Sequence, residues 1–199
     1  MKRLAVLASG GGTDLQSIID AVESGNVKGE IAVVVSDKEN AYALTRAKNH
    51  GIRHEYVKRG ERDTLLSLLD SLRVDYVILA GYLGILPEVV VKHYNNKIIN
   101  IHPSLIPSFC GMGFYGMRVH EAVYKRGVKY TGCTVHFVDE GADTGAIIKQ
   151  VVVEVDEEDT PEIIQQKVLK EEHKLLPYVV GLLCEDRVVV VDGRVKIKG

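Results

Sequence analysis

Short apolar runs alternate with amphipathic segments along the first half of the chain. Such runs predict strands buried on both faces, which lack the polar alternation of a half-exposed strand. The predicted strands lie at residues 4–8, 31–36, 53–57, 76–81 and 97–101. Helical spacing of apolar residues predicts helices near residues 13–24, 40–50 and 65–72. Strands that alternate with helices in this way predict a parallel sheet covered on both faces, and therefore an α/β fold.

The second half of the chain shows a different pattern. Residues 117–125 predict a helix, while the runs 130–138 and 146–155 predict two more strands. Thr160 and Pro161 suit the N-cap and first position of a long helix. The apolar stripe of that helix contains Glu172, and a carboxylate facing the core without a partner is costly, which indicates a ligand contact. The turn residues Asp192 and Gly193 predict a closing hairpin.

A glycine-rich turn, Ser9-Gly10-Gly11-Gly12-Thr13-Asp14, joins the first strand to the first helix. Thr13 and Gln16 fit a capping box that would start the helix at Thr13. The turn presents backbone N–H groups at the positive end of a helix dipole, which suits a phosphate, although a plain tight turn is the alternative. Since neither a Walker A nor a dinucleotide fingerprint is present, a monophosphate is favoured. The charge of Asp14 would oppose a phosphate unless its side chain points away.

Two polar side chains that suit catalysis lie at the end of the fifth predicted strand. Asn100 and His102 lie two residues apart and therefore face the same side of the sheet. Asn can hydrogen-bond a carbonyl oxygen that gains charge, and His can move a proton near neutral pH. Asp143, in the acidic turn 139–145, is the carboxylate that suits a ligand or a charged His best. The alternative for the strand end is a packed histidine with a structural hydrogen bond.

Composition narrows the possible partners. The net charge of -2 and pI of about 6.4 give no basic footprint for nucleic acid or anionic lipid. No apolar segment approaches the roughly 20 residues of a membrane span. Three cysteines far apart in sequence predict reduced thiols in a cytoplasmic protein and no zinc cage or other metal site. The apolar loop 82–87 suits equally the wall of a pocket for a flat ring or a piece of core.

The segment from Asn100 to Pro107, with Gly141-Ala142-Asp143-Thr144-Gly145 downstream, resembles the folate-dependent formyltransferase superfamily. The glycine loop and the Glu172-His173 helix extend the resemblance over essentially the whole chain. It implies a Rossmann-like three-layer sandwich with a mostly parallel central sheet and an antiparallel C-terminal part. It further implies one domain, 1–199, in which residues 1–100 form the phosphate-binding half and 101–199 the catalytic and folate-binding half.

The resemblance also implies an activity, the transfer of a formyl group from 10-formyltetrahydrofolate to the amine of 5'-phosphoribosylglycinamide in purine synthesis. With no evident nucleophile beside a base, we expect direct attack by the amine through a tetrahedral intermediate. Asn100 and protonated His102 would stabilise the oxyanion, and Asp143 would support the charged His. We expect a monomer or homodimer without metal, nucleic acid or membrane partners. Rivals are a tRNA formyltransferase, a formylfolate hydrolase and a noncatalytic nucleotide-binding domain.

Carried over by position, the implied catalytic residues are Asn100, His102 and Asp143. The implied substrate-binding residues are Gly12, Thr13, Asp14, Leu169, Lys170, Glu171 and Glu172. The implied folate-binding residues are Arg59, Leu83, Gly84, Ile85, Leu86, Asn100, Asp139, Glu140, Gly141, Ala142 and Asp143. The chain departs from the family's pattern at Asp14, which replaces Asn, at Gly84, which replaces a basic residue, and at Cys110, which replaces proline.

Overall fold

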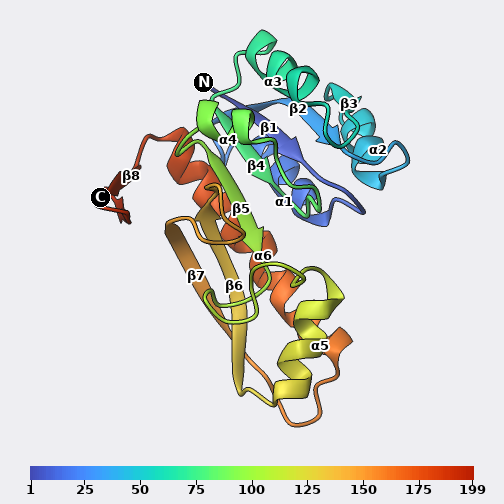
Figure 1. Ribbon diagram of the computed structural model, residues 1–199, viewed down its shortest axis with the longest axis vertical. Helices are drawn as coiled ribbons and strands as arrows, with labels where there is room; N and C mark the ends of the chain where they lie inside the picture. Colours follow the sequence, from blue (N-terminus) through green and yellow to red (C-terminus); the bar gives the residue numbers. More distant parts are fainter.

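The computed structural model describes residues 1–199 as a central sheet flanked by helices, with a separate hairpin (Figure 1). The strands are β1 (Lys2–Leu7), β2 (Gly29–Ser36), β3 (His54–Tyr56), β4 (Tyr76–Leu79), β5 (Ile98–His102), β6 (Tyr130–Phe137), β7 (Ile147–Glu154), β8 (Val188–Val191) and β9 (Arg194–Ile197). The helices are α1 (Thr13–Glu23), α2 (Tyr42–Asn49), α3 (Arg62–Ser71), α4 (Glu88–His93), α5 (Met117–Arg126) and α6 (Pro161–Cys184).

The main sheet has seven strands in the order β3-β2-β1-β4-β5-β6-β7. Strands β1 to β5 pair in parallel, whereas β6 and β7 join the sheet antiparallel. The predicted Rossmann-like fold with an antiparallel C-terminal part is therefore confirmed. The boundary expected between residues 100 and 101 falls inside β5, so both halves share one sheet.

Helices cover both faces of the sheet and form two layers of core. Alternate side chains of β1 enter opposite layers, because successive strand residues point to opposite faces. Leu4 and Val6 pack with residues of α1 and α6, whereas Ala5 and Leu7 pack with residues of α3 and α4. No helix here combines the length and apolarity that crossing a bilayer requires.

The helix starts show where local sequence signals predicted the structure and where they did not. Thr160 accepts a hydrogen bond from the Ile163 N–H and Pro161 follows it, as predicted for α6. Helix α1 does begin at Thr13, but the predicted capping box is wrong. Its N-cap is Gly12 in a left-handed conformation, φ 69°, without a side-chain cap. Helix α4 was not predicted from the sequence, because its six residues after Pro87 are too few to show a helical period.

Candidate active site

The candidate catalytic residues meet where β5 and β6 run side by side. Asn100 lies opposite His136 in the antiparallel register, and His102 lies opposite Thr134. Asp143 comes from the turn between β6 and β7 and has a φ of 58°. The structure thus brings the predicted trio of Asn100, His102 and Asp143 together and adds His136, which sequence reasoning left unassigned.

His102 is buried, with 4% of its surface exposed. Its Nε2 lies 2.9 Å from the Phe109 carbonyl oxygen, which can only accept, so this nitrogen carries the proton. Its Nδ1 lies 3.6 Å from Asp143 Oδ2. Burial lowers the pKa of His102, although the Phe109 carbonyl and Asp143 oppose this effect. His102 is therefore neutral near pH 7 in the free protein, and its Nδ1 is free to take up a proton.

Asp143 lies between two imidazoles. Its Oδ2 accepts a hydrogen bond from the Gly111 N–H at 2.9 Å, and its Oδ1 is 3.5 Å from His136 Nε2. Burial acts to raise the pKa of Asp143. The nearby imidazole of His136, the hydrogen bond from the Gly111 N–H and the nearby imidazole of His102 together outweigh burial and hold that pKa below its usual range. Asp143 is therefore an ionised carboxylate poised to stabilise a protonated His102.

His136 orients the amide of Asn100. The imidazole Nδ1 donates to the Phe137 carbonyl at 2.8 Å, which leaves Nε2 as an acceptor for Asn100 Nδ2 at 3.2 Å. The second N–H of that amide stays free for a ligand. The sequence signal for His136 was its place on the same face of the strand as Thr134, two residues away.

A first cleft of about 770 Å³ runs from the glycine loop to the catalytic residues. Five of the seven implied substrate-binding residues line it: Gly12, Thr13, Asp14, Leu169 and Glu172. Lys170 and Glu171 do not line it. Positions 169 and 172 are three apart and share one helix face, whereas the two residues between them project elsewhere. His120 also lines this cleft and is buried, and burial with the nearby His102 lowers its pKa to about 4.

The glycine loop leaves backbone donors available at the far end of the first cleft. The Gly10 carbonyl accepts from Ala43, and the Gly12 carbonyl accepts from Gln16. The N–H groups of Gly11, Gly12 and Thr13 donate to no group of the protein. Together with the N-terminal end of α1, these donors suit a phosphate group.

Gly12→Ala is expected to destabilise the protein by about 1–3 kcal/mol, because Gly12 has a φ of 69° that a non-glycine residue adopts only under strain. The new Cβ would also lie 2.8 Å from the Cβ of Ala43. Gly10→Ala is the matched control, since nothing lies within 4 Å of its added Cβ. Urea unfolding checks the pair, and equal losses in both variants would contradict the conformational argument.

Asp14 and Glu172 form a buried acidic pair in the first cleft. Asp14 is 9% and Glu172 7% exposed, and Asp14 Oδ1 is buried without a hydrogen-bond partner. Burial raises the pKa of Asp14 to about 6. Burial and the carboxyl of Asp14 raise the pKa of Glu172 well above its usual range. The pair therefore holds a proton that neutralises part of its charge, which reduces the expected repulsion of a phosphate by Asp14.

Asp14→Asn is expected to stabilise the protein at pH 7.5, by an amount on the order of 1–3 kcal/mol. A raised folded-state pKa means that the native protein keeps a proton that the unfolded chain releases. Stability is therefore lost as the pH rises from 3.8 to about 6. The gain from the amide should disappear at pH 4. Unfolding at both pH values tests this, with the exposed Asp20→Asn on the same helix as control. A gain equal at both pH values would contradict it.

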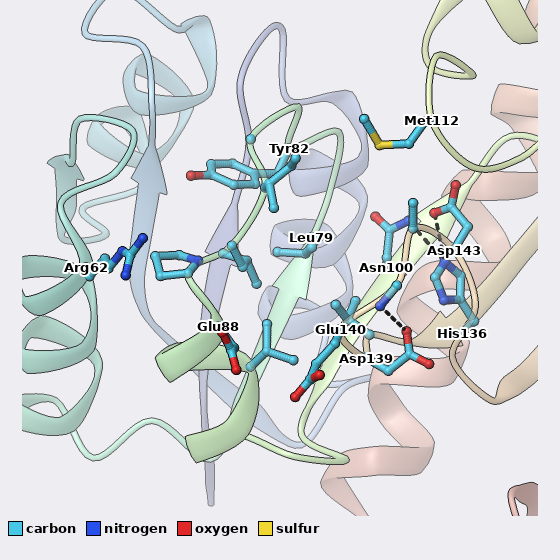
Figure 2. A pocket seen from close by; sticks show the side chains of 18 of the residues that line it. Arg62, Leu79, Tyr82, Glu88, Asn100, Met112, His136, Asp139, Glu140 and Asp143 are labelled. Carbon is cyan, nitrogen blue, oxygen red and sulfur yellow. Dashed lines mark hydrogen bonds and ion pairs between the residues drawn. The ribbon is translucent and has the colours of Figure 1, made fainter.

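A second cleft of about 670 Å³ shares the candidate catalytic residues Asn100 and Asp143 with the first (Figure 2). It is lined by most of the implied folate residues: Gly84, Ile85, Leu86, Asn100, Asp139, Glu140, Gly141, Ala142 and Asp143. Leu83 and Arg59 line the first cleft instead, whereas Arg62 lies in the second. Figure 2 shows Arg62 at one end of this cleft and Asn100, His136 and Asp143 at the other. The apolar loop 82–87 is therefore a wall between clefts more than a piece of core.

The two clefts meet at the candidate catalytic residues. Asn100 and Asp143 line both, as do Tyr82, Ile85 and Met112. A ligand held by its phosphate at the glycine loop and a flat ligand in the second cleft would therefore approach each other at these residues. The arrangement suits a reaction between two small molecules with a proton transfer at the junction.

Comparison with known proteins agrees with this geometry. A family model described as formyl transferase matches residues 2–180. The chain is 39% identical to phosphoribosylglycinamide formyltransferase of Haemophilus influenzae, over 100% of this chain and 95% of that protein. It is 40% identical to the chloroplastic phosphoribosylglycinamide formyltransferase of Arabidopsis thaliana, over 94% of this chain and 67% of that protein.

A solved structure shows the same fold. The crystal structure of glycinamide ribonucleotide transformylase 1 from Symbiobacterium toebii matches with a TM-score of 0.93 and 39% identity. The match covers 100% of this chain and 95% of that one. Because the match covers the whole chain, the shared fold includes every element that carries a candidate site residue.

Proposed function

We propose, from the premise that this chain belongs to the formyl transferase family, that it formylates the amine of 5'-phosphoribosylglycinamide in purine biosynthesis. The donor is 10-formyltetrahydrofolate, a co-substrate, and the second cleft suits it because apolar side chains such as Leu79, Ile85 and Val91 line it together with the charged Arg62. The observation that carries the proposal is the meeting of two clefts at Asn100 and Asp143, one beginning at the glycine loop with its free N–H donors and the other lined by the loop 82–87 and the turn 139–143.

In the proposed mechanism the amine of the nucleotide attacks the formyl carbon directly. The free N–H of Asn100 stabilises the oxygen that gains negative charge in the tetrahedral intermediate. His102, neutral at the start, takes a proton from the attacking nitrogen at Nδ1, and Asp143 stabilises the resulting imidazolium. The bond between the formyl carbon and the folate nitrogen then breaks, and the imidazolium of His102 gives its proton to that nitrogen, which completes the transfer and restores the neutral imidazole. In this mechanism His102 starts neutral and becomes protonated during the attack, whereas the expectation from the sequence was a protonated His102 at the start.

The remaining assignments follow from the two clefts. The glycine loop with Asp14, Leu169 and Glu172 holds the nucleotide, while the loops around Gly84 and Asp139 hold the folate. Arg62 suits the polar end of the folate better than Arg59, because Arg62 lines the second cleft. A cytoplasmic location and a monomer or homodimer remain the expectations from the sequence.

Acceptor dependence tests the proposal. The protein is mixed with 10-formyltetrahydrofolate, and loss of the formyl group is followed with phosphoribosylglycinamide, with glycinamide lacking the phosphoribosyl group, and without acceptor. Rapid loss only with the complete nucleotide supports the proposal. Equal loss in the absence of an acceptor would instead identify a hydrolase of formyl folates.

A further inference from the structure

One buried carboxylate near the active site has no part in the proposed chemistry. Asp37 directly follows β2, and its side chain is only 1% exposed. Its Oδ1 accepts a hydrogen bond from Ser9 Oγ at 2.5 Å, and its Oδ2 accepts one from Arg59 Nε at 2.7 Å. Both oxygens are thus occupied by groups from two different loops.

Ser9 extends this connection to a third loop. Its Oγ, which donates to Asp37, accepts a hydrogen bond from the Leu83 N–H at 2.8 Å. The Ser9 N–H donates to the Gly81 carbonyl at 3.0 Å. A continuous chain of hydrogen bonds therefore runs from Arg59 through Asp37 and Ser9 to Leu83. We call these four residues the Asp37 chain.

The Asp37 chain lies where it can affect both clefts. Ser9 begins the glycine loop that suits the phosphate, and Leu83 lies in the loop 82–87 that separates the clefts. Within that loop Tyr82 and Ile85 line both clefts. A shift of the loop relative to the glycine loop would change the distance between the two bound substrates, and small errors of this kind slow a bimolecular reaction strongly.

We propose that Asp37 is a positioning residue that couples the phosphate-binding loop to the wall of the folate cleft. The inference rests on the proposed function, because it concerns how the two substrates of that reaction are aligned. Asp37 lines neither cleft. It acts through Ser9 and Arg59, and its ionised form suits two donors, one of which is a guanidinium.

Two substitutions cut the chain at different places. Ser9→Ala removes the contacts to both Asp37 and the Leu83 N–H while keeping the backbone bond to Gly81. Asp37→Asn keeps an oxygen acceptor for Ser9 but faces Arg59 with an amide donor. Glu30→Gln is the matched control, because Glu30 lies on β2, the strand that Asp37 follows, and has an exposed contact of 2.7 Å with Arg3 that lines neither cleft.

Equilibrium binding of phosphoribosylglycinamide and of tetrahydrofolate, each alone, tests the coupling. Ser9→Ala and Asp37→Asn should each weaken both ligands about threefold to tenfold, a penalty comparable to that of one hydrogen bond, while Glu30→Gln changes neither. The double variant should lose less than the product of the single losses, because both changes act on one chain. A merely structural role would lower the unfolding midpoint without weakening both ligands.

The inference is overturned if Ser9→Ala weakens only the nucleotide, or if the losses multiply independently in the double variant. Should Asp37→Asn fail to fold, Ser9→Ala still decides the question, because it deletes only a hydroxyl. Failure of the proposed function gives a different result. The unsubstituted protein would then transfer no formyl group, whatever the two substitutions do to binding.

Discussion

His102→Asn lowers kcat for formyl transfer by a factor on the order of 10² to 10⁴ in this account, with folding intact. Asparagine retains a hydrogen-bonding side chain, but its amide is not a base near neutral pH and cannot take up the proton that the attacking amine must lose. The Phe109 carbonyl loses its imidazole donor, and Asp143 loses the group whose positive charge it stabilises. Steady-state kinetics with both substrates saturating measure the effect.

The same variant should bind both ligands nearly as well as the unsubstituted protein, since His102 is assigned to proton transfer. His54→Asn is a suitable control, because His54 lies in β3 and is exposed away from both clefts. Full activity of His102→Asn on both substrates would show that proton transfer does not use this imidazole.

Asp143→Asn is expected to reduce kcat by roughly 10²- to 10³-fold, because a neutral amide does not stabilise the imidazolium of His102. The backbone is expected to tolerate the change. Asp143 has a φ of 58°, and asparagine adopts this left-handed conformation more readily than other non-glycine residues. The amide oxygen can still accept from the Gly111 N–H. The loss should therefore appear mainly in kcat, with a smaller loss of stability, because the native fold lowers the pKa of Asp143 and so favours its ionised form.

Asp192→Asn provides the matched control, since Asp192 also has a positive φ, 51°, but lies in the hairpin turn far along the chain. It should leave both kcat and stability unchanged. If Asp143→Asn lost stability without losing kcat at saturating substrate, Asp143 would be a structural turn residue and its assigned role would be incorrect.

Much of this architecture could be predicted from local patterns. Buried parallel strands are continuous apolar runs, so β1, β2 and β4 were visible in the sequence. The two-residue spacing of Asn100 and His102 predicted their common face, and the stripe on α6 predicted the burial of Glu172. Each of these features depends on residues close together in the chain.

Features that depend on distant residues could not be predicted in this way. His136 gains its role from the register of β6 against β5, which no local pattern specifies. Arg59 and Arg62 lie three residues apart, and only the folded loop shows that they line different clefts. The bonds of Asp37 join loops that lie far from it in sequence.

The fate of the formyl carbon shows whether the amine of the nucleotide attacks the formyl folate directly. 10-Formyltetrahydrofolate labelled with ¹³C at the formyl carbon is incubated with the protein, phosphoribosylglycinamide and an excess of unlabelled formate. Direct attack by the amine predicts that mass spectrometry finds the label undiluted in the formylated nucleotide and none on the protein. Label recovered as free formate, or diluted by the unlabelled pool before it reaches the nucleotide, would contradict direct transfer.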